Sequence, residues 1–285
     1  MANKITELGV LVGYACNFAC AHCITAREKR EKLTSAEIRL LISQINKHTV
    51  KSLLFVGGET SLYVRDINTI LLGIRKLDAT KVKITTNGHF AITKTAAKEK
   101  ILSFHRLNSV QLSYDKFHAE FLPFRNVRNL YAACKDLGLE FSVILTIESP
   151  LDIVYAKRLW GVGKFPIGIQ KVLQIGKAVS NKNAYVFPSF DKKVLKRSCP
   201  NLNRIKYLPG QGFSICCSLL AYKHADNFTH TSLSKHLRSR FYGLVSKYSF
   251  GEIAHLLNIN VKNLEPRYSH ECNLCEYIFK KGRQS

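Results

Sequence analysis

The sequence lacks any apolar stretch close to the roughly 20 residues that a helix needs to cross a membrane. Its first residues, Met1 to Lys4, lead directly into Ile5 and Leu8 without a signal-peptide pattern. It also contains no internal repeat and no low-complexity tract. These absences predict a cytoplasmic protein without a membrane partner. In that reducing compartment, the nine cysteines are better explained as metal ligands and core residues than as disulfides.

Acidic residues are scarce: 20 Asp and Glu face 43 Lys and Arg, which leaves a formal net charge of +23. Such a charge favours association with an anionic partner, such as RNA, an acidic peptide or a phosphorylated small molecule. The basic residues are spread along the chain, however, so a lysine-rich solvated surface explains them equally well. They occur in Arg27 to Lys32, Lys81 to Lys100, Lys157 to Lys177, Lys192 to Lys206 and Lys235 to Lys247.

Short β-like runs alternate with amphipathic helical segments through the first part of the 285 residues. Thr34-Ser35-Ala36-Glu37 is a capping box, which begins the first helix. Further apolar helical faces begin near Ile67, Thr93 and Val127, and Gly138 suits the end of the last one. The predicted strands are Leu8 to Tyr14, Ser52 to Val56, Val82 to Thr86, Ser109 to Ser113, Phe141 to Thr146 and Ile169 to Ile175.

This alternation predicts an α/β fold of βα units around a parallel sheet. The pattern alone fits either a partial barrel or a doubly wound sheet, and in both the functional loops lie at the carboxyl ends of the strands. After about residue 185 the alternation stops, and Phe187-Pro188-Ser189-Phe190 is typical of a linker. We therefore expect a first domain of residues 1–185 and a smaller second domain of residues 186–285.

Three cysteines, Cys16, Cys20 and Cys23, follow the first predicted strand at a Cys-x3-Cys-x2-Cys spacing. A loop leaving a strand can fold three thiolates at this spacing around one iron–sulfur cluster, because soft thiolates suit such clusters. A cluster normally takes four ligands, so one iron is left open to substrate chemistry. The alternatives are a zinc site lacking its fourth ligand, or three unrelated cysteines.

This loop resembles the cluster loop of the radical S-adenosylmethionine (radical SAM) superfamily. The resemblance implies that the amino and carboxylate groups of the methionine part of S-adenosylmethionine (SAM) complete a [4Fe–4S] cluster. It also implies that an electron from the cluster cleaves SAM to a 5′-deoxyadenosyl radical. It covers residues 5 to 180 and favours the partial (β/α)6 TIM-like barrel of that superfamily over a doubly wound sheet.

Two other strand ends carry segments similar to cofactor-binding motifs of the superfamily. Gly57-Gly58-Glu59 follows the second strand, where paired glycines let the backbone approach a ligand and a carboxylate accepts hydrogen bonds from an ammonium group. It looks like the Gly-Gly-Glu motif that binds the methionine amino group. Thr85-Thr86-Asn87-Gly88 ends the third strand and is similar to a Thr-Asn-Gly segment of many radical SAM enzymes. The resemblance thus implies cofactor contacts for Gly57, Gly58, Glu59 and Asn87.

The fourth strand ends at Ser113, which resembles the position that hydrogen-bonds the cofactor ribose. Asp115 is expected to support the same loop, with a surface-loop role for Asp115 and His118 as the alternative.

Gln174-Ile175-Gly176-Lys177-Ala178 ends the sixth strand and resembles a Gly-Arg-Ala segment, with Lys177 in place of arginine. His22 replaces the aromatic residue common in the cluster loop, and its imidazole can still lie against the adenine edge. Gln174 and His22 thereby complete the expected cofactor-binding residues. The sequence identifies no acid or base for the substrate.

A second thiolate set lies in the last third of the chain. The series Cys199, twelve residues, Gly212, four residues, Cys217 fits the opening motif of the SPASM and twitch domains of this superfamily, and a late Cys-x2-Cys closes the simpler twitch type. The resemblance covers residues 195 to 278 and implies an auxiliary [4Fe–4S] cluster. Its ligands are expected to be Cys199, Cys217, Cys272 and Cys275, with Cys216 as the alternative to Cys217.

Four thiolates leave no open iron, which suits an electron relay or a structural role. A structural zinc site with four cysteine ligands is the alternative. Cys134 lies on an apolar helix face and is expected to be a core thiol.

The resemblance implies an enzyme that abstracts hydrogen from a substrate, with a peptide or protein side chain as the favoured target. Flavodoxin or ferredoxin is the expected electron donor. An RNA-modifying enzyme and a dehydrogenase of sugars or natural products are alternatives, the former because of the charge. A zinc-stabilised nucleic-acid-binding protein without radical chemistry is the alternative from another class.

Overall fold

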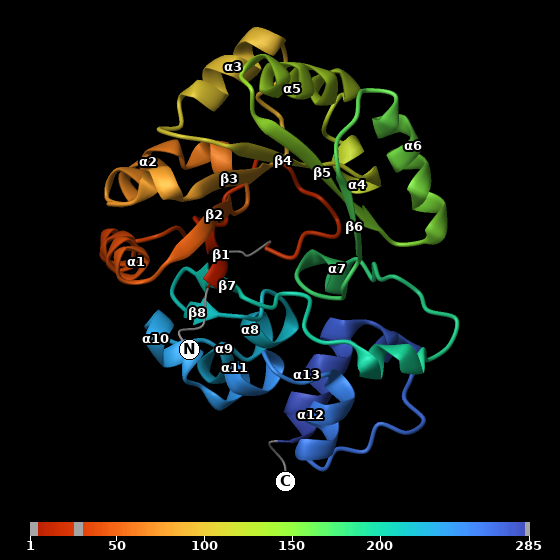
Figure 1. The fold of residues 1–285 in the computed structure, drawn as a ribbon. Coiled ribbons are helices and arrows are strands. Elements are labelled where there is room, and N and C mark those ends of the chain that lie inside the picture. The colour runs from red at the N-terminus through yellow and green to blue at the C-terminus, as the bar shows by residue number, and fades with distance from the viewer. Residues whose placement is uncertain (1–4, 26–30, 283–285) are drawn as a thin grey trace. The chain divides into compact units, whose positions relative to one another are not determined.

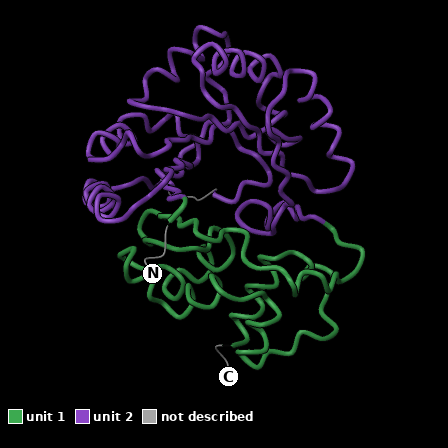
Figure 2. Tube along the Cα trace, in the orientation of Figure 1, with its two compact units in different colours: residues 1–6, 186–285 green, residues 7–185 purple. Residues whose placement is uncertain are grey.

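The computed structural model describes residues 5–25 and 31–282. Met1 to Lys4, in which no signal-peptide pattern was found, lie outside these residues. The start of the basic segment at Arg27 does so too. The chain forms two compact units, one of Glu7–Tyr185 and one of residues 186–282 together with Ile5 and Thr6 (Figure 2). Within the described ranges, no helix is long and apolar enough to cross a membrane.

Six strands form the sheet of the unit Glu7–Tyr185, in the order β6-β5-β4-β3-β2-β1 (Figure 1). Neighbouring strands from β2 to β6 pair in parallel. In the described part of the chain, β1 and β6 lie at opposite ends of this order, so the sheet is open. The α/β partial barrel predicted above is confirmed. The strands are β1 (Ile5–Leu11), β2 (Val50–Val56), β3 (Lys81–Thr86), β4 (Ser109–Ser113), β5 (Glu140–Ile147) and β6 (Ile167–Lys171).

Helices follow these strands, and the longer ones lie outside the curve of the sheet (Figure 1). They are α1 (Ser35–Lys47), α2 (Val64–Leu72), α3 (Lys94–Leu102), α4 (Lys116–Ala119), α5 (Phe124–Asp136), α6 (Val154–Trp160) and α7 (Lys177–Ser180), with 3-10 turns η1 (Thr60–Leu62), η2 (Leu77–Ala79) and η3 (Pro150–Ile153). The predicted capping box begins α1, because Thr34 accepts from the Glu37 N–H and Glu37 accepts from the Thr34 N–H. Gly138, at φ 66°, follows the end of α5 as expected.

The first and sixth strands differ from their predictions. The first covers Ile5–Leu11, whereas Leu8 to Tyr14 was the expected range. The sixth leaves the sheet earlier than predicted. It covers Ile167–Lys171, whereas Ile169 to Ile175 was the expected range. Beyond Val172, which still donates to the Ile147 carbonyl oxygen, the chain leaves the sheet. Gly176 adopts φ 59°, a left-handed conformation that suits glycine, and begins α7. Apolar residues after the strand therefore pack in a loop, which periodicity alone does not distinguish from a strand.

The unit of residues 186–282 contains one antiparallel pair and several short helices. Aromatic side chains form much of its core, since the rings of Phe228, Phe241 and Phe279 lie 4.7–5.8 Å from one another. Its elements are η4 (Lys192–Lys196), β7 (Arg204–Leu208), β8 (Gly212–Ser214), α8 (Leu219–Lys223), α9 (Ala225–Phe228), α10 (Leu233–Leu237), α11 (Arg240–Val245), α12 (Phe250–Leu256), η5 (Pro266–Ser269) and α13 (Glu271–Lys281).

Cys134 is fully buried on α5, as expected of a core thiol. Burial raises the pKa of its thiol to about 12, which keeps it protonated and unreactive.

Candidate functional site

The loop that carries Cys16, Cys20 and Cys23 follows β1 and is held by the turn after β2. The backbone N–H of Gly58 donates to the Gly13 carbonyl (2.8 Å), and that of Glu59 donates to the Ala15 carbonyl (2.9 Å). A Cβ at position 58 would lie 2.1 Å from the Ala15 carbonyl oxygen. The close approach that the glycine pair permits is thus made to the cysteine loop in this structure.

Tyr63, which the sequence does not single out, also holds this loop. Its hydroxyl oxygen accepts a hydrogen bond from the Ala15 N–H at 2.8 Å. Its ring lies so close to Gly13 that a Cβ there would come within 2.5 Å of it. The only signal in the sequence is an aromatic residue soon after the Gly-Gly-Glu segment, which is too general to predict this contact.

The sulfur of Cys16 has two N–H donors. It accepts from the backbone N–H of Phe18 (3.3 Å) and from the side-chain amide of Asn87 (3.6 Å). Burial raises the pKa of the Cys16 thiol, and these two donors only partly offset it. For Cys20, burial and then the negative charge of Asp115 raise the pKa of the thiol to about 12. Such a thiol loses its proton when a metal binds, so this loop suits metal coordination better than nucleophilic chemistry.

Glu59 joins the ends of β2 and β3 and is only 1% exposed. Its Oε1 accepts from the Ser61 N–H (2.9 Å) and the Thr86 hydroxyl (2.7 Å), and its Oε2 accepts from the Asn87 N–H (2.7 Å). Asn87 in turn donates through Nδ2 to Asn17 Oδ1 (2.7 Å) as well as to Cys16. The structure therefore brings together the predicted residues Glu59 and Asn87 beside the cysteine loop.

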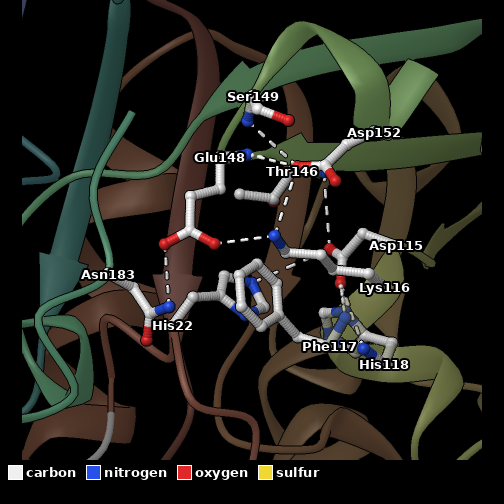
Figure 3. Close-up of polar contacts among 10 residues, drawn as sticks. All are labelled: His22, Asp115, Lys116, Phe117, His118, Thr146, Glu148, Ser149, Asp152 and Asn183. Carbon is white, nitrogen blue, oxygen red and sulfur yellow. Dashed lines mark hydrogen bonds and ion pairs between the residues drawn. The ribbon is translucent and has the colours of Figure 1, made fainter. Parts of the chain in front are cut away.

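Asp115 caps α4 and is completely buried, so the surface-loop alternative is wrong for this residue. Its Oδ1 accepts from the Phe117 N–H, the His118 N–H and His118 Nδ1, at 2.9–3.0 Å, and its Oδ2 accepts from the Thr146 N–H at 3.4 Å (Figure 3). Burial raises the pKa of this carboxyl, but the hydrogen bond and charge of His118 outweigh it and hold the pKa below its ordinary value.

His22 packs against this turn from the cysteine loop. Its ring stacks on Phe117 at 4.2 Å between centroids, and its Nε2 lies 3.7 Å from Asp115 Oδ2. Burial lowers the pKa of His22 to about 4, so the ring is neutral at pH 7. Phe117 also packs against Cys20, and α4 thereby supports the loop between its second and third cysteines.

A charged network at the end of β5 was missed from the sequence. Lys116 pairs with Glu148 (2.6 Å) and Asp152 (3.5 Å), and Glu148 also accepts from Asn183 Nδ2 (2.8 Å) (Figure 3). Burial lowers the pKa of Lys116, but the two carboxylates outweigh burial and the pKa is raised overall. Residues so far apart in the chain show no spacing pattern that predicts their contact.

Two predicted cofactor-binding residues are less buried than Glu59 and Asp115. Ser113 is half-buried at the end of β4, and Gln174 is exposed after β6. The segment that contains Gln174 meets the cysteine loop through other groups. The Lys177 N–H donates to the Cys23 carbonyl (3.0 Å), and a Cβ at Gly176 would lie 2.3 Å from the same oxygen. Asn181 Nδ2 also donates to the Ala21 carbonyl oxygen (2.9 Å).

Residues 10–147 match the family model described as the Radical SAM superfamily. They contain the cysteine loop, Glu59, Asn87 and Asp115. This region is a radical SAM domain. A curated relative is the "Probable GTP 3′,8-cyclase" of Saccharolobus solfataricus, which is 33% identical over 108 residues, or 37% of this chain and 34% of the relative. Homologues from other Saccharolobus strains match over the same length. The chain thus spans about a third of the length of the curated relatives it matches.

Solved radical SAM structures share the fold. SuiB of Streptococcus suis aligns with a TM-score of 0.51 and 14% identity, over 86% of this chain and 68% of SuiB. The structure of anSMEcpe with bound AdoMet and Cp18Cys peptide aligns with a TM-score of 0.56 and 11% identity, over 99% and 97% of the two chains.

Radical SAM proteins bind a [4Fe–4S] cluster and SAM, and the residues of this loop fit that pair. Three thiols lie on one loop, N–H donors point at the Cys16 sulfur, and a buried carboxylate lies alongside. Oxygen Oε2 of Glu59 accepts only from Asn87 among the described residues, so it retains a lone pair for a further donor.

The second unit contains a cavity lined by all five cysteines of this part of the chain, namely Cys199, Cys216, Cys217, Cys272 and Cys275. Burial raises the pKa of Cys199 to about 12 and raises those of Cys272 and Cys275 well above the ordinary value. Apolar rings, including those of Phe241 and Phe250, complete the lining. Such a gathering of buried sulfurs suits a metal centre that requires several thiolates.

Both Cys216 and Cys217 face this cavity, and both sulfurs have hydrogen-bond donors. Backbone groups at the start of α8, including that of Ser218, donate to Cys216, and Asn201 Nδ2 donates to Cys217 at 2.9 Å. These contacts therefore do not distinguish Cys216 from Cys217 as the fourth thiolate ligand of a metal centre. Behind them, the buried His236 accepts from the Ile215 N–H at 2.8 Å and fixes the strand that leads into the cysteine pair.

The spacing of these sulfurs is wider than one zinc ion requires. Among the described residues, three or more ligand atoms lie within 4.8 Å of one another only at His22, Asp115 and His118. Zinc–sulfur bonds of about 2.3 Å place four tetrahedral sulfurs roughly 3.8 Å apart. The five thiols of the cavity are not so gathered, which favours a larger metal cluster over a single zinc ion.

The contact of Gly58 with the cysteine loop gives a first prediction. Gly58→Ala places a methyl group against the Ala15 carbonyl oxygen, so the loop must shift and the spacing of its cysteines must change. We expect a loss of about 1–3 kcal/mol in unfolding free energy, typical of an extra methyl group forced into a packed site, and weaker iron binding by the loop. Urea unfolding and iron analysis measure both effects.

Gly243→Ala is the matched control, because a Cβ there meets nothing within 4 Å and the residue lies in α11. A Gly58→Ala protein as stable and as rich in iron as this control would contradict the role of the glycine.

Proposed function

We propose that this chain reductively cleaves SAM at a [4Fe–4S] cluster held by Cys16, Cys20 and Cys23, and that it modifies a peptide or protein side chain. When bound, the cluster and SAM supply an electron and the 5′-deoxyadenosyl radical that removes a hydrogen atom from the substrate. The observation that carries this proposal is the position of the three cysteines. They lie on one loop at the carboxyl edge of an open parallel sheet, within the region that matches the family.

The residues around the loop have distinct roles in this proposal. The buried Glu59 fixes Asn87, and its Oε2 accepts the ammonium group of the SAM methionine. Asn87 donates to the Cys16 sulfur, which stabilises a metal-bound thiolate. Asp115 acts indirectly, because its oxygens are occupied by donors from its own turn and from β5.

The peptide or protein substrate is supported by the structures that share the fold. The anSMEcpe structure contains a bound peptide and aligns over nearly all of both chains, and SuiB has been solved with its precursor peptide SuiA. These alignments include the region after residue 185, whereas the match to the probable GTP cyclases covers only 108 residues.

A nucleotide is the second candidate substrate. The curated relatives are named as probable GTP 3′,8-cyclases, and the net charge of +23 favours an anionic partner. RNA has the same attraction, and the sugar or natural-product dehydrogenase stays a further alternative.

We further propose that the second unit binds an auxiliary [4Fe–4S] cluster through Cys199, Cys217, Cys272 and Cys275, with Cys216 as the alternative to Cys217. The support is the five-cysteine cavity and its wide sulfur spacing. A protein with two such clusters suits the reducing cytoplasm, where flavodoxin or ferredoxin is available as the electron donor.

Replacing Cys16, Cys20 and Cys23 together with alanine tests the first cluster. We expect the variant to form no 5′-deoxyadenosine from SAM and dithionite, because no other described thiols lie on this loop. The iron of the second unit should stay bound, and it serves as the internal control for folding. Formation of 5′-deoxyadenosine at the wild-type rate would overturn the assignment.

The choice of substrate is tested with a mixture of synthetic peptides and, separately, with GTP. With SAM and dithionite, we expect peptides to lose two hydrogens or to form crosslinks, as measured by mass spectrometry. The triple-cysteine variant should leave the peptides unchanged. Consumption of GTP in step with 5′-deoxyadenosine, with unchanged peptides, would establish the nucleotide alternative instead.

Replacing Cys272 and Cys275 with alanine tests the auxiliary cluster. Metal that organises distant ligands contributes directly to folding, so we expect the loss of about half of the iron and easier proteolysis after residue 195. Iron and zinc analyses of wild type and variant measure this. About four irons per wild-type chain, with a tightly bound zinc lost in the variant, would show a zinc site instead.

A further inference from the structure

The inner face of the curved sheet is directed away from the helices (Figure 1). In β3, β4 and β5, alternate residues are buried on the helix side, where Leu145 and Ile147 of β5 pack with Ala156 of α6. The residues between them point to the inner face, because successive side chains of a strand alternate. An ion pair agrees with this direction. Lys83 of β3 meets Glu7 of β1 at 3.1 Å, across the intervening β2.

This inner face is polar. Ile144 is the one apolar residue that β3, β4 and β5 place on it. The interior of a closed barrel is normally filled by bulky branched side chains. Here Thr85, Gln111, Ser142 and Thr146 are only half-buried, so their polar groups can reach water or a ligand. The face therefore has the composition of a binding surface and not of a packed core.

Gln111 lies at the centre of this face, in a row of three neutral polar residues. The strand register places Thr85 of β3 and Ser142 of β5 directly opposite Gln111 of β4. Thr85 Oγ1 donates to Gln111 Oε1 at 3.1 Å. A carboxamide has an acceptor oxygen and a donor nitrogen, so this contact occupies one end of the group and leaves the other for a ligand. The row thus presents two hydroxyl groups and a carboxamide side by side.

The charges that β3, β4 and β5 place on the inner face are already paired. Lys83 pairs with Glu7, and Lys81 at the start of β3 pairs with Glu140 at the start of β5. The charges of this face therefore cancel, although the whole chain carries a formal net charge of +23. Burying a further charge without a counterion is costly. The face accordingly favours a hydroxyl or carboxamide group of a ligand over an ionised one.

The row also lies close to the cysteine loop. Thr85 precedes Asn87 by two residues, and the side-chain amide of Asn87 donates to the Cys16 sulfur at 3.6 Å. Two residues of a strand span roughly 6.6 Å. A substrate group held by the row is therefore placed beneath the loop, on the side where the sheet is open to it.

We propose that Gln111, with Thr85 and Ser142 on either side, selects the side chain that this protein modifies, and that it selects a neutral polar one: serine, threonine, asparagine or glutamine of a peptide. This inference rests on the proposed function, because it takes a peptide or protein as the substrate. Hydroxyl and carboxamide groups both donate and accept, as the row does. The guanine base of GTP has the same chemistry, and the experiment below separates the two sources.

The test uses synthetic peptides that share one sequence and differ at one central residue. They are incubated with the anaerobically reconstituted protein, SAM and dithionite, and GTP is incubated separately. Mass spectrometry measures which peptides lose hydrogen or form crosslinks. We expect a central serine, threonine, asparagine or glutamine to be modified at least about tenfold faster than aspartate, lysine or leucine, which is the effect of one or two unmade hydrogen bonds.

Two substitutions of Gln111 should change this preference in different directions. Gln111→Glu keeps the size of the side chain and adds a negative charge, so the preference should move to the peptide with a central lysine. Gln111→Leu removes the hydrogen-bonding groups, so leucine should be modified as fast as the neutral polar residues. A merely structural role of Gln111 does not produce such shifts. Gln111→Leu decides the matter if Gln111→Glu fails to fold or to take up its cluster.

Ile169→Glu is the matched control. The register pairs Ile169 of β6 with Leu145, which lies on the helix side of the sheet, and Ile169 is 51% exposed. This variant adds the same charge to the opposite face of the sheet and should keep the wild-type preference.

Wild type that forms no 5′-deoxyadenosine with any peptide or with GTP would refute the proposed function itself. Formation of 5′-deoxyadenosine with no modified peptide, or modification of all peptides at one rate, would overturn only the selection of a neutral polar side chain. A wild-type preference in both Gln111 variants would contradict the role of this residue. Consumption of GTP with unchanged peptides would identify the base as the bound group and exclude the peptide side chain.

Discussion

The backbone contact between the turn after β2 and the start of the cysteine loop is the constraint on which the site depends. Two hydrogen bonds join Gly58 and Glu59 to Gly13 and Ala15, and they form only because position 58 has no side chain. This contact fixes the first residues of the loop relative to the sheet. Tyr63, which bonds to Ala15 from the same turn, adds a second attachment. These backbone contacts therefore position the start of the cysteine loop without a bound metal.

Buried carboxylates provide the second layer of organisation. Glu59 and Asp115 are both nearly inaccessible to water, and each is surrounded by N–H or O–H donors from two strand ends. A buried carboxylate is costly unless it is fully hydrogen-bonded, so these residues strongly favour one arrangement of the loops around them. The arrangement is rigid on the side of β3 and β4, which is the side where Asn87 and His22 meet the cysteines.

Sequence reasoning predicted the parts that depend on local patterns. The capping box of α1, the four strands β2 to β5 and the glycine after α5 follow from spacing and from residue type. The end of β6 did not, because Val172 and Ile175 are buried in a loop and look the same as strand residues. A local pattern predicts that residues are buried, but it does not predict whether they lie in a strand or in a loop.

The contacts of the candidate site could be predicted only where a motif carried them. Glu59 and Asn87 were found in this way, although the partners of Glu59 in the structure are groups of the protein. Tyr63 bonds to Ala15, Lys116 pairs with Glu148, and Asn183 donates to Glu148. None of these pairs has a characteristic spacing in the sequence. Gln174 shows the reverse case, since the motif pointed to a side chain and the structure uses the backbone of its neighbours Gly176 and Lys177.

The contacts of Lys177 and Asn181 with the cysteine loop have a consequence for the order of folding. Asn181 donates to Ala21 across a sequence separation of 160 residues, and Lys177 donates to Cys23 across almost as many. Contacts of such separation form late, because the intervening chain must first be collapsed and ordered. During synthesis the cysteines emerge early, but the loop that steadies them emerges only after all six strands. The part of the loop that holds Ala21 and Cys23 is therefore completed only when the whole sheet has been synthesised.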